Sequence, residues 1–356
     1  MRGSSLRDRS SPRVGSSASP PRSAGYRLDR GFDPEWKGVV PEVATAPLPD
    51  ETARAIQAAE SQDGDDLSAA DWKTIACHVG EVADVAQAIS LATKLPPDVC
   101  RVLVLAARWH DLGKAHTAFQ GGIRRSDRPS RQDLAKAPGN AWPRRPKTYR
   151  TVDDKDVRPG LRHELASALA LFAVLQRHRP RHAALLGPWV DALALIGSSV
   201  ADDPTESTAT PCAQAVIDCS ADEFDLLVYL VASHHGKVRM ALHATPKDQD
   251  YRDSDGRGLP IRGVREGDEL PSVLLDVAAP PLPALALSLE PATLGLSPTT
   301  GRSWRERTLG LVARLGPGAL AWLEALLIAA DRRASQLTTV DPLLAAPRSD
   351  SPQEPE

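Results

Sequence analysis

Apolar residues recur at helical spacing along most of the chain from residue 71 onward. Segments rich in Ala and Leu, with apolar positions every three or four residues, predict helices. These segments cover residues 72–92, 97–112, 162–178, 182–198, 221–236, 304–315 and 317–337. Alternating runs rich in β-branched residues, which would predict strands, are scarce. We therefore predict an all-α fold in the form of a helical bundle.

Two long stretches interrupt this helical pattern. Residues 117–160 contain several prolines and many arginines, and residues 240–300 are rich in Pro, Gly and Asp. We predict two long loop insertions in the bundle, of which the second can carry a small β-hairpin around residues 272–275. Loops of this length inside a compact domain tend to be functional or disordered.

Both ends of the chain differ in composition from its middle. Residues 1–30 are rich in Ser, Arg and Pro, and such a segment cannot bury enough apolar surface to fold. Residues 31–68 predict an extended segment with one short helix near 51–60. We therefore expect a disordered or extended lead-in over 1–68, one folded domain over 69–340, and a disordered tail over 341–356.

Composition limits the classes of protein that this chain can belong to. The net charge is −3, so a surface for nucleic acid would have to be local. Four cysteines are scattered without a C-x-x-C pair, which predicts buried thiols in a reducing compartment. The N-terminus has no hydrophobic run, and we find no apolar stretch long enough to span a bilayer. We expect a cytoplasmic protein without a membrane partner.

Imidazoles and carboxylates lie at the ends of the apolar stripes of several predicted helices. In the first helix, for example, the stripe that contains Ile75 and Val82 also contains His78, so this imidazole faces the core. Such side chains are costly to bury unless they are paired or bind metal. The candidate ligands found in this way are His78, His110, Asp111, His163, His234, His235 and Asp331.

The number of these residues, rather than any one of them, indicates a metal site. A single buried histidine is better explained as a hydrogen-bonded core residue, and the His110–Asp111 pair alone is a weak motif. Five imidazoles and two carboxylates, however, fit two divalent ions that share one carboxylate, with Mn, Fe, Co, Ni or Mg as candidates. Asp111 is the natural shared ligand because it directly follows another one.

Two such ions can clamp a phosphodiester and turn a bound water into a nucleophile at neutral pH. We assign catalytic roles to Asp111 and to Lys114, which lies one turn later and can hold a phosphate oxygen or orient a ligand. A solvated lysine at a helix end explains Lys114 equally well. His163-Glu164 begins like a zincin motif but lacks the second histidine. The four remaining histidines that we expect at the surface are His116, His178, His182 and His243.

The residues around Asp111 resemble the HD nuclease domain of type I CRISPR effectors, which is usually fused to or paired with a DNA helicase. The most specific match is the segment His110-Asp111-Leu112-Gly113-Lys114-Ala115 followed by Phe119-Gln120. Further matches are His163-Glu164 with Ser167, Ser233-His234-His235-Gly236, and Ala330-Asp331 with Ser335. The resemblance covers residues 70–337, and residues 262–268 resemble a subtype that carries this domain at its C-terminal end.

The resemblance implies an HD-domain bundle and a metal-dependent DNA nuclease of antiviral defence that prefers single strands. It implies one ion held by His78, His110, Asp111 and Asp331, and a second held by Asp111, His163, His234 and His235. Family members act with a DNA helicase and a guide-RNA surveillance complex. Because we find no helicase motif here, the helicase would be a separate chain, or this chain a detached fragment.

A basic stretch directly follows the HD motif. Residues 117–150 contain nine Lys and Arg against two Asp, a local excess of seven positive charges. Such a stretch can line the path of a DNA strand, and Trp142 and Tyr149 within it could stack on bases. A basic loop without a defined contact explains the pattern equally well. The candidate nucleic-acid contacts are Arg124, Arg125, Arg144 and Arg145.

Two other functions remain open. One is an HD-family phosphohydrolase that cleaves nucleotides or cyclic dinucleotides with the same two ions. The other is a metal-free HD module that acts only as a protein partner. The complete set of seven candidate ligands argues against the metal-free module, and the basic stretch with the Phe119-Gln120 match favours the nuclease.

Overall fold

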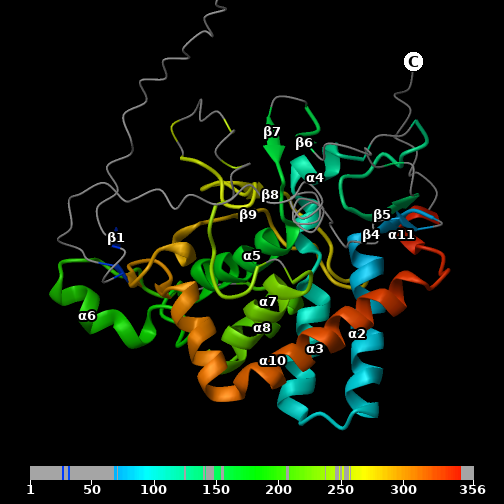
Figure 1. Cartoon of the computed structure of the whole chain (residues 1–356). Coiled ribbons are helices and arrows are strands. Elements are labelled where there is room, and N and C mark those ends of the chain that lie inside the picture. The colour runs from blue at the N-terminus through cyan, green and yellow to red at the C-terminus, as the bar shows by residue number, and fades with distance from the viewer. Residues whose placement is uncertain are drawn as a thin grey trace, which may run out of the picture. The chain divides into compact units, whose positions relative to one another are not determined.

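The computed structural model divides the chain into two units, residues 1–57 and 58–356 (Figure 1). It describes residues 26–27, 31–32, 68–69, 71–123, 126–138, 141, 148–153, 156–205, 208–236, 238–244, 248, 251, 256 and 258–345. In the first unit, β1 (Tyr26–Arg27) and β2 (Gly31–Phe32) pair antiparallel. The rest of the expected lead-in up to residue 67, with the helix near 51–60, lies outside the described residues.

Helices form the core of the second unit, which confirms the predicted all-α fold class. The principal helices are α2 (Ile75–Ala92), α3 (Pro97–Trp109), α5 (His163–His178), α8 (Ala221–Ser233) and α10 (Trp304–Ser335). Helix α2 packs against α3 and α10, and α8 packs against α3, α5 and α10. Capping boxes at Ser220 and Ser303 begin α8 and α10.

Helix α10 bends where two separate helices were expected. Gly316 has a φ of 79° and a ψ of 156°, and Pro317 follows it. A positive φ is readily adopted only by glycine, and proline removes a helical hydrogen bond, so the pair breaks the helix at this point. Figure 1 shows the resulting change of direction between the two halves of α10.

The helix expected over residues 182–198 is much shorter in the structure. Only η3 (Gly187–Trp189) and α6 (Val190–Leu195) are helical there. Pro188 has no backbone N–H, so it is tolerated in the first turn of η3 but cannot continue a helix that begins at residue 182. The structure also contains shorter helices that were not predicted as separate elements. They are η1 (Leu112–Ala115), α4 (Thr117–Gly121), α7 (Pro211–Ile217), η4 (Glu290–Ala292) and α11 (Pro342–Ala345).

Short strands are found in both insertions. Strands β3 (Ser68–Ala69), β5 (Leu134–Pro138) and β4 (Lys73–Thr74) form a sheet in that order, parallel between β3 and β5 and antiparallel between β5 and β4. The other antiparallel pairs are β6 (Thr148–Arg150) with β7 (Val157–Pro159), β8 (Glu269–Leu270) with β9 (Leu285–Ala286), and β10 (Leu296–Ser297) with β11 (Gly301–Arg302). Val273 forms a bridge with Leu282, so the expected hairpin is present.

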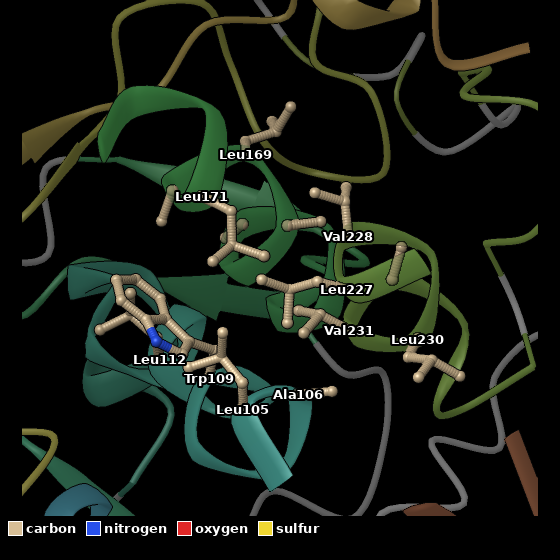
Figure 2. Close-up of a cluster of buried hydrophobic side chains, with 14 of the residues drawn as sticks. Leu105, Ala106, Trp109, Leu112, Leu169, Leu171, Leu227, Val228, Leu230 and Val231 are labelled. Atoms are coloured by element: carbon tan, nitrogen blue, oxygen red, sulfur yellow. The ribbon is translucent and has the colours of Figure 1, made fainter. Parts of the chain in front are cut away.

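Close packing of apolar side chains fixes the ends of the helices that carry the candidate ligands (Figure 2). The buried side chains in this cluster include Leu105, Ala106, Trp109, Leu112, Leu169, Leu171, Leu227, Val228 and Val231. Fully burying one Leu or Val side chain is worth roughly 1.5–3 kcal/mol. Because His110 directly follows α3 and His234 directly follows α8, this packing also places both imidazoles.

By length and composition alone, α2 and α10 could cross a membrane, although the sequence analysis identified no such stretch. Both helices pack within the bundle, and each carries a polar candidate ligand, His78 on α2 and Asp331 on α10. Core helices of soluble proteins pass the same test, so the result is only a weak indication of a membrane span.

The end of the folded unit extends beyond residue 340. Asp341 is buried, and its Oδ2 accepts a hydrogen bond of 2.6 Å from the backbone N–H of Thr74. Helix α11 follows it, so residues 341–345 of the expected tail are folded against the β4 strand. The remaining tail, 346–356, lies outside the described residues.

Candidate metal centre

The structure brings the seven candidate ligands together around Asp111. Two groups have potential ligand atoms within 4.8 Å of one another and could hold a metal ion: His78, His110 and Asp111, and His163, His234 and His235. Asp111 belongs to the first group and also contacts the second. Its Oδ2 is 3.4 Å from Nε2 of both His78 and His110, and its Oδ1 is 3.2 Å from Nε2 of His163.

Asp331 reaches the same centre from the last turns of α10. Its Oδ1 lies 3.0 Å from Nε2 of His78 and 3.9 Å from Nε2 of His110. On the other side of Asp111, Nε2 of His235 lies 3.2 Å from Nε2 of His163. Asp331 and His235 are more exposed than the other members of the cluster, which are buried.

The hydrogen bonds of two imidazoles fix which nitrogen faces the centre. Nδ1 of His110 and Nδ1 of His234 each lie 2.7 Å from the carbonyl oxygen of a preceding helical residue, Ala107 and Val231. The Nδ1–H therefore donates to the backbone, and Nε2 keeps its lone pair. Both Nε2 atoms are buried without a hydrogen-bond partner among the described residues, an arrangement that is costly unless a cation binds there. The residues present therefore fit a divalent metal ion.

Electrostatics keep the ligands in the protonation states that bind cations. Burial, helped by the nearby Lys136, lowers the pKa of His78 to about 4, and burial with His235 lowers the pKa of His234. Burial opposes ionisation of Asp111, but His110 and Lys114 outweigh it and hold the carboxyl pKa well below its usual range. At neutral pH the imidazoles of His78 and His234 are therefore neutral and the carboxylate of Asp111 is charged, as metal binding requires.

Lys114 is buried rather than solvated, so the surface interpretation of this residue is wrong. Its Nζ lies 2.8 Å from Oδ2 of Asp111 and 5.8 Å from the centre of the Phe119 ring. This ammonium group therefore fixes the carboxylate that joins the two histidine groups.

A close contact between the turn that carries the HD motif, residues 110–115 (the HD turn), and the start of α5 explains why glycine occupies position 113. A Cβ atom on Gly113 would lie 2.0 Å from the carbonyl oxygen of His163. The Ser167 hydroxyl donates to the carbonyl of His110 and accepts from the backbone N–H of Gly113, both at 2.7 Å. These contacts hold His163 next to Asp111.

Gln120 connects the HD turn to strand β5. Its Nε2 donates to the carbonyl oxygens of Lys114 and Leu134, at 2.7 and 2.9 Å. Phe119 stacks on Tyr149 with ring centres 6.3 Å apart. Tyr149 is buried, so the expectation that it stacks on bases is wrong.

Two charged residues near the ligands were not predicted as site residues. Lys136 of β5 is buried, with its Nζ 3.7 Å from Oδ1 of Asp331, although it had been counted only in the basic stretch. Glu164 is also buried, and neither of its carboxylate oxygens has a hydrogen-bond partner within the described part of the chain. Its nearest ion-pair contact is Nδ1 of His163, at 3.7 Å.

Three of the four histidines expected at the surface are buried, which corrects that prediction. Nε2 of His116 lies 3.1 Å from Oδ2 of Asp268. His182 contacts the carbonyl oxygen of Ile217 through Nε2, at 3.1 Å, and His178 is buried at the end of α5. His243 is exposed as expected. Long-range polar partners, which sequence spacing does not reveal, account for the burial of His116 and His182.

The four arginines proposed to contact nucleic acid, Arg124, Arg125, Arg144 and Arg145, lie outside the described residues, as does Trp142. Other cations of the basic stretch serve internal contacts. Arg128 donates to the carbonyl oxygen of Gln120 at 2.6 Å, and Arg131 pairs with Asp133 at 2.6 Å.

Comparison with known proteins identifies the family. A family model described as "Cas3, HD domain" matches residues 59–340, which is most of the chain. No curated protein and no solved structure gave a match. The matched range contains all seven candidate ligands, and members of this family are CRISPR-associated, metal-binding HD nucleases. The chain therefore belongs to the Cas3 HD-domain family.

Proposed function

We propose that this chain is a metal-dependent nuclease that cleaves single-stranded DNA in antiviral defence. It would work in the cytoplasm with a separate DNA helicase and a guide-RNA surveillance complex, unless it is a detached fragment of a chain that contains both activities. The observation that carries the proposal is the position of Asp111, which forms one group that could hold a metal ion with His78 and His110 and lies 3.2 Å from His163 of a second such group.

Two divalent ions are the cofactors in this proposal, with Mn, Fe, Co, Ni or Mg as candidates. His78, His110, Asp111 and Asp331 would hold one ion, and Asp111, His163, His234 and His235 the other. When bound, such ions activate water as a nucleophile and neutralise charge on a phosphodiester.

The chain's own residues would orient the reacting groups. Asp111 is held by Lys114 at 2.8 Å, so its carboxylate presents a fixed pair of oxygens to the two groups of histidines. Four further ligands are buried, and their burial excludes bulk water, which strengthens electrostatic interactions; they are His78, His110, His163 and His234. Because His235 and Asp331 are the more exposed members, we propose that the phosphodiester approaches from their side.

One assay separates the nuclease from the small-molecule hydrolase. The purified full chain is incubated with circular single-stranded DNA and, separately, with nucleotides and cyclic dinucleotides, in Mn²⁺, Ni²⁺ or Mg²⁺ and in a chelator control. We expect metal-dependent cutting of the DNA circle, which has no ends and so reports endonuclease activity. Turnover of nucleotides with intact DNA would refute the nuclease proposal.

Hydrolysis of nucleotides or cyclic dinucleotides is the second candidate function. The observation in its favour is the depth of the centre: His78, His110 and Asp111 are at most 1% exposed. A small substrate enters such a site more easily than a polymer does. The engagement of Arg128 and Arg131 in internal contacts also reduces the number of basic groups open to DNA.

We predict that exchanging the four candidate arginines for glutamine weakens DNA binding and its dependence on salt. Each phosphate contact contributes about 0.7 to the slope of log affinity against log salt for single strands, so loss of four contacts lowers the slope by about 3. Binding is measured in chelator to prevent cleavage. The variant changes Arg124, Arg125, Arg144 and Arg145.

A matched control changes four exposed arginines on other segments, and its slope should stay at the wild-type value. These arginines are Arg177, Arg181, Arg305 and Arg314. An equal fall in slope for both variants would contradict a DNA contact specific to the basic stretch.

A further inference from the structure

Strand β5 places a lysine in a buried position next to the centre. Lys136 is 1% exposed, and its neighbours in the strand, Ala135 and Ala137, are fully buried. A buried ammonium group is costly unless a partner of opposite charge lies close to it. The group therefore needs a partner in the interior.

The carboxylate of Asp331 provides opposite charge. Nζ of Lys136 lies 3.7 Å from Oδ1 of Asp331, the same oxygen that lies 3.0 Å from Nε2 of His78. The ammonium and a divalent ion held by His78 would therefore be attracted to one carboxylate. A similar arrangement is found at the other carboxylate, where Lys114 lies 2.8 Å from Asp111.

Strand β4, which pairs with β5, carries a second buried lysine that has a different partner. Lys73 of β4 is the register partner of Lys136, so the two side chains lie on the same face of the sheet. Nζ of Lys73 pairs with Glu81 and donates at 2.8 Å to the carbonyl oxygen of Leu337, just beyond the end of α10. Both lysines thus engage the C-terminal end of α10, but only Lys136 is paired with a candidate ligand there.

We propose that Lys136 is a positioning residue that balances the charge of Asp331 in the metal-free centre and yields this carboxylate to a divalent ion. The inference rests on the proposed metal centre but does not depend on the identity of the substrate. It assigns to the 117–160 insertion, through β5, a role in holding the centre folded before the ion binds.

Removal of the ammonium has consequences of opposite sign for folding and for metal binding. Without Lys136, the buried charge of Asp331 is left without this counter-charge, so the metal-free protein becomes less stable. The divalent ion, however, no longer competes with a nearby positive charge, so its affinity increases. If Lys136 served only to pack β5, its removal would lower stability and would weaken metal binding or leave it unchanged.

The test compares Lys136→Met, Lys136→Arg and the matched control Lys73→Met in the full chain. Melting temperature is measured in chelator, and Mn²⁺ affinity by calorimetric titration. We expect Lys136→Met to melt at a lower temperature than wild type. At the site of higher affinity, however, the variant should bind Mn²⁺ about tenfold more strongly than wild type does. Lys136→Arg, which keeps the charge, should bind Mn²⁺ like wild type. Lys73→Met should melt earlier with unchanged Mn²⁺ affinity.

Unchanged or weaker Mn²⁺ binding by Lys136→Met would overturn the inference. If that variant does not fold, Lys136→Gln takes its place, because it keeps a hydrogen-bond donor without the charge, and the same outcomes apply. Failure of the wild-type chain to cut DNA, with tighter Mn²⁺ binding by the variant, would refute the nuclease proposal and leave the role of Lys136 intact.

Discussion

Replacement of Asp111 by alanine is expected to abolish both metal binding and phosphodiester hydrolysis. The carboxylate lies 3.2–3.4 Å from imidazole nitrogens of both histidine groups, so its loss removes a ligand from each proposed ion. We expect the bound metal to fall from two ions to at most one weakly held ion. The rate should fall on the order of 10³-fold or more. Elemental analysis of the purified protein and cleavage of circular single-stranded DNA measure the two effects.

A loss of activity through unfolding must be distinguished from a loss of ligands. Asp111→Ala leaves the buried Lys114 without this counter-charge and is therefore destabilising, whereas the double variant Asp111→Ala/Lys114→Met removes both charges. We expect the double variant to recover thermal stability without recovering metal or activity. Retention of two tightly bound ions in Asp111→Ala would show that Asp111 does not join two metal sites.

Helical periodicity was enough to find residues whose position depends on one helix. His78 and His110 follow the apolar stripes of α2 and α3, and burial of those stripes alone turns both imidazoles inward. The same reasoning places Asp331 on the inner face of α10. Periodicity within each helix predicts that these residues face a core. The close approach of the two histidine groups around Asp111 results from tertiary packing between the helices.

Residues whose position depends on pairing between distant segments were not predicted. Lys136 is a single charged residue in a five-residue strand, and its burial results from pairing with β3 and β4 on either side. His116 follows the end of a short helical turn, and sequence spacing predicts a solvated side chain there, but its partner Asp268 is 152 residues further along the chain. No local periodicity encodes such contacts, so sequence patterns assigned both residues to the surface or to a loop.

The second insertion also has a structural role that its composition did not indicate. Asp268 accepts two hydrogen bonds from Arg158, at 2.6 and 2.8 Å, and one from the backbone N–H of Arg265, at 2.8 Å. Nearby, Gly263 lies so close to the segment before α5 that a Cβ atom would be 2.5 Å from Cα of Leu161. Residues 262–268, which resembled a subtype motif, thus connect the HD turn through His116 to the segment that begins α5.

Replacement of Asp268 by asparagine is expected to lower the free energy of unfolding by about 1–3 kcal/mol, because it removes the bidentate partner of the buried Arg158, which keeps its ion pair with Asp156. Chemical denaturation of the metal-free protein measures this change. Asp276→Asn is the matched control, since Asp276 is partly exposed and its 3.6 Å surface pair with Arg108 is worth at most about 1 kcal/mol. The amide oxygen of asparagine can still accept the hydrogen bond that Oδ1 of Asp276 receives from the backbone N–H of Ala278.

The pH dependence of stability gives a second measurement of the same contact. Burial opposes ionisation of Asp268, but His116 and Arg158 outweigh it and keep the carboxyl pKa below its usual range. A depressed pKa contributes stability that is complete above the unfolded-state value, about 3.9, and is lost as the pH falls toward the folded-state value. Wild-type stability should therefore fall below about pH 4, and Asp268→Asn should lose part of that slope. An unchanged slope in the variant would mean that the Arg158–Asp268 pair contributes little, and that the connection to α5 rests on the Gly263 contact instead.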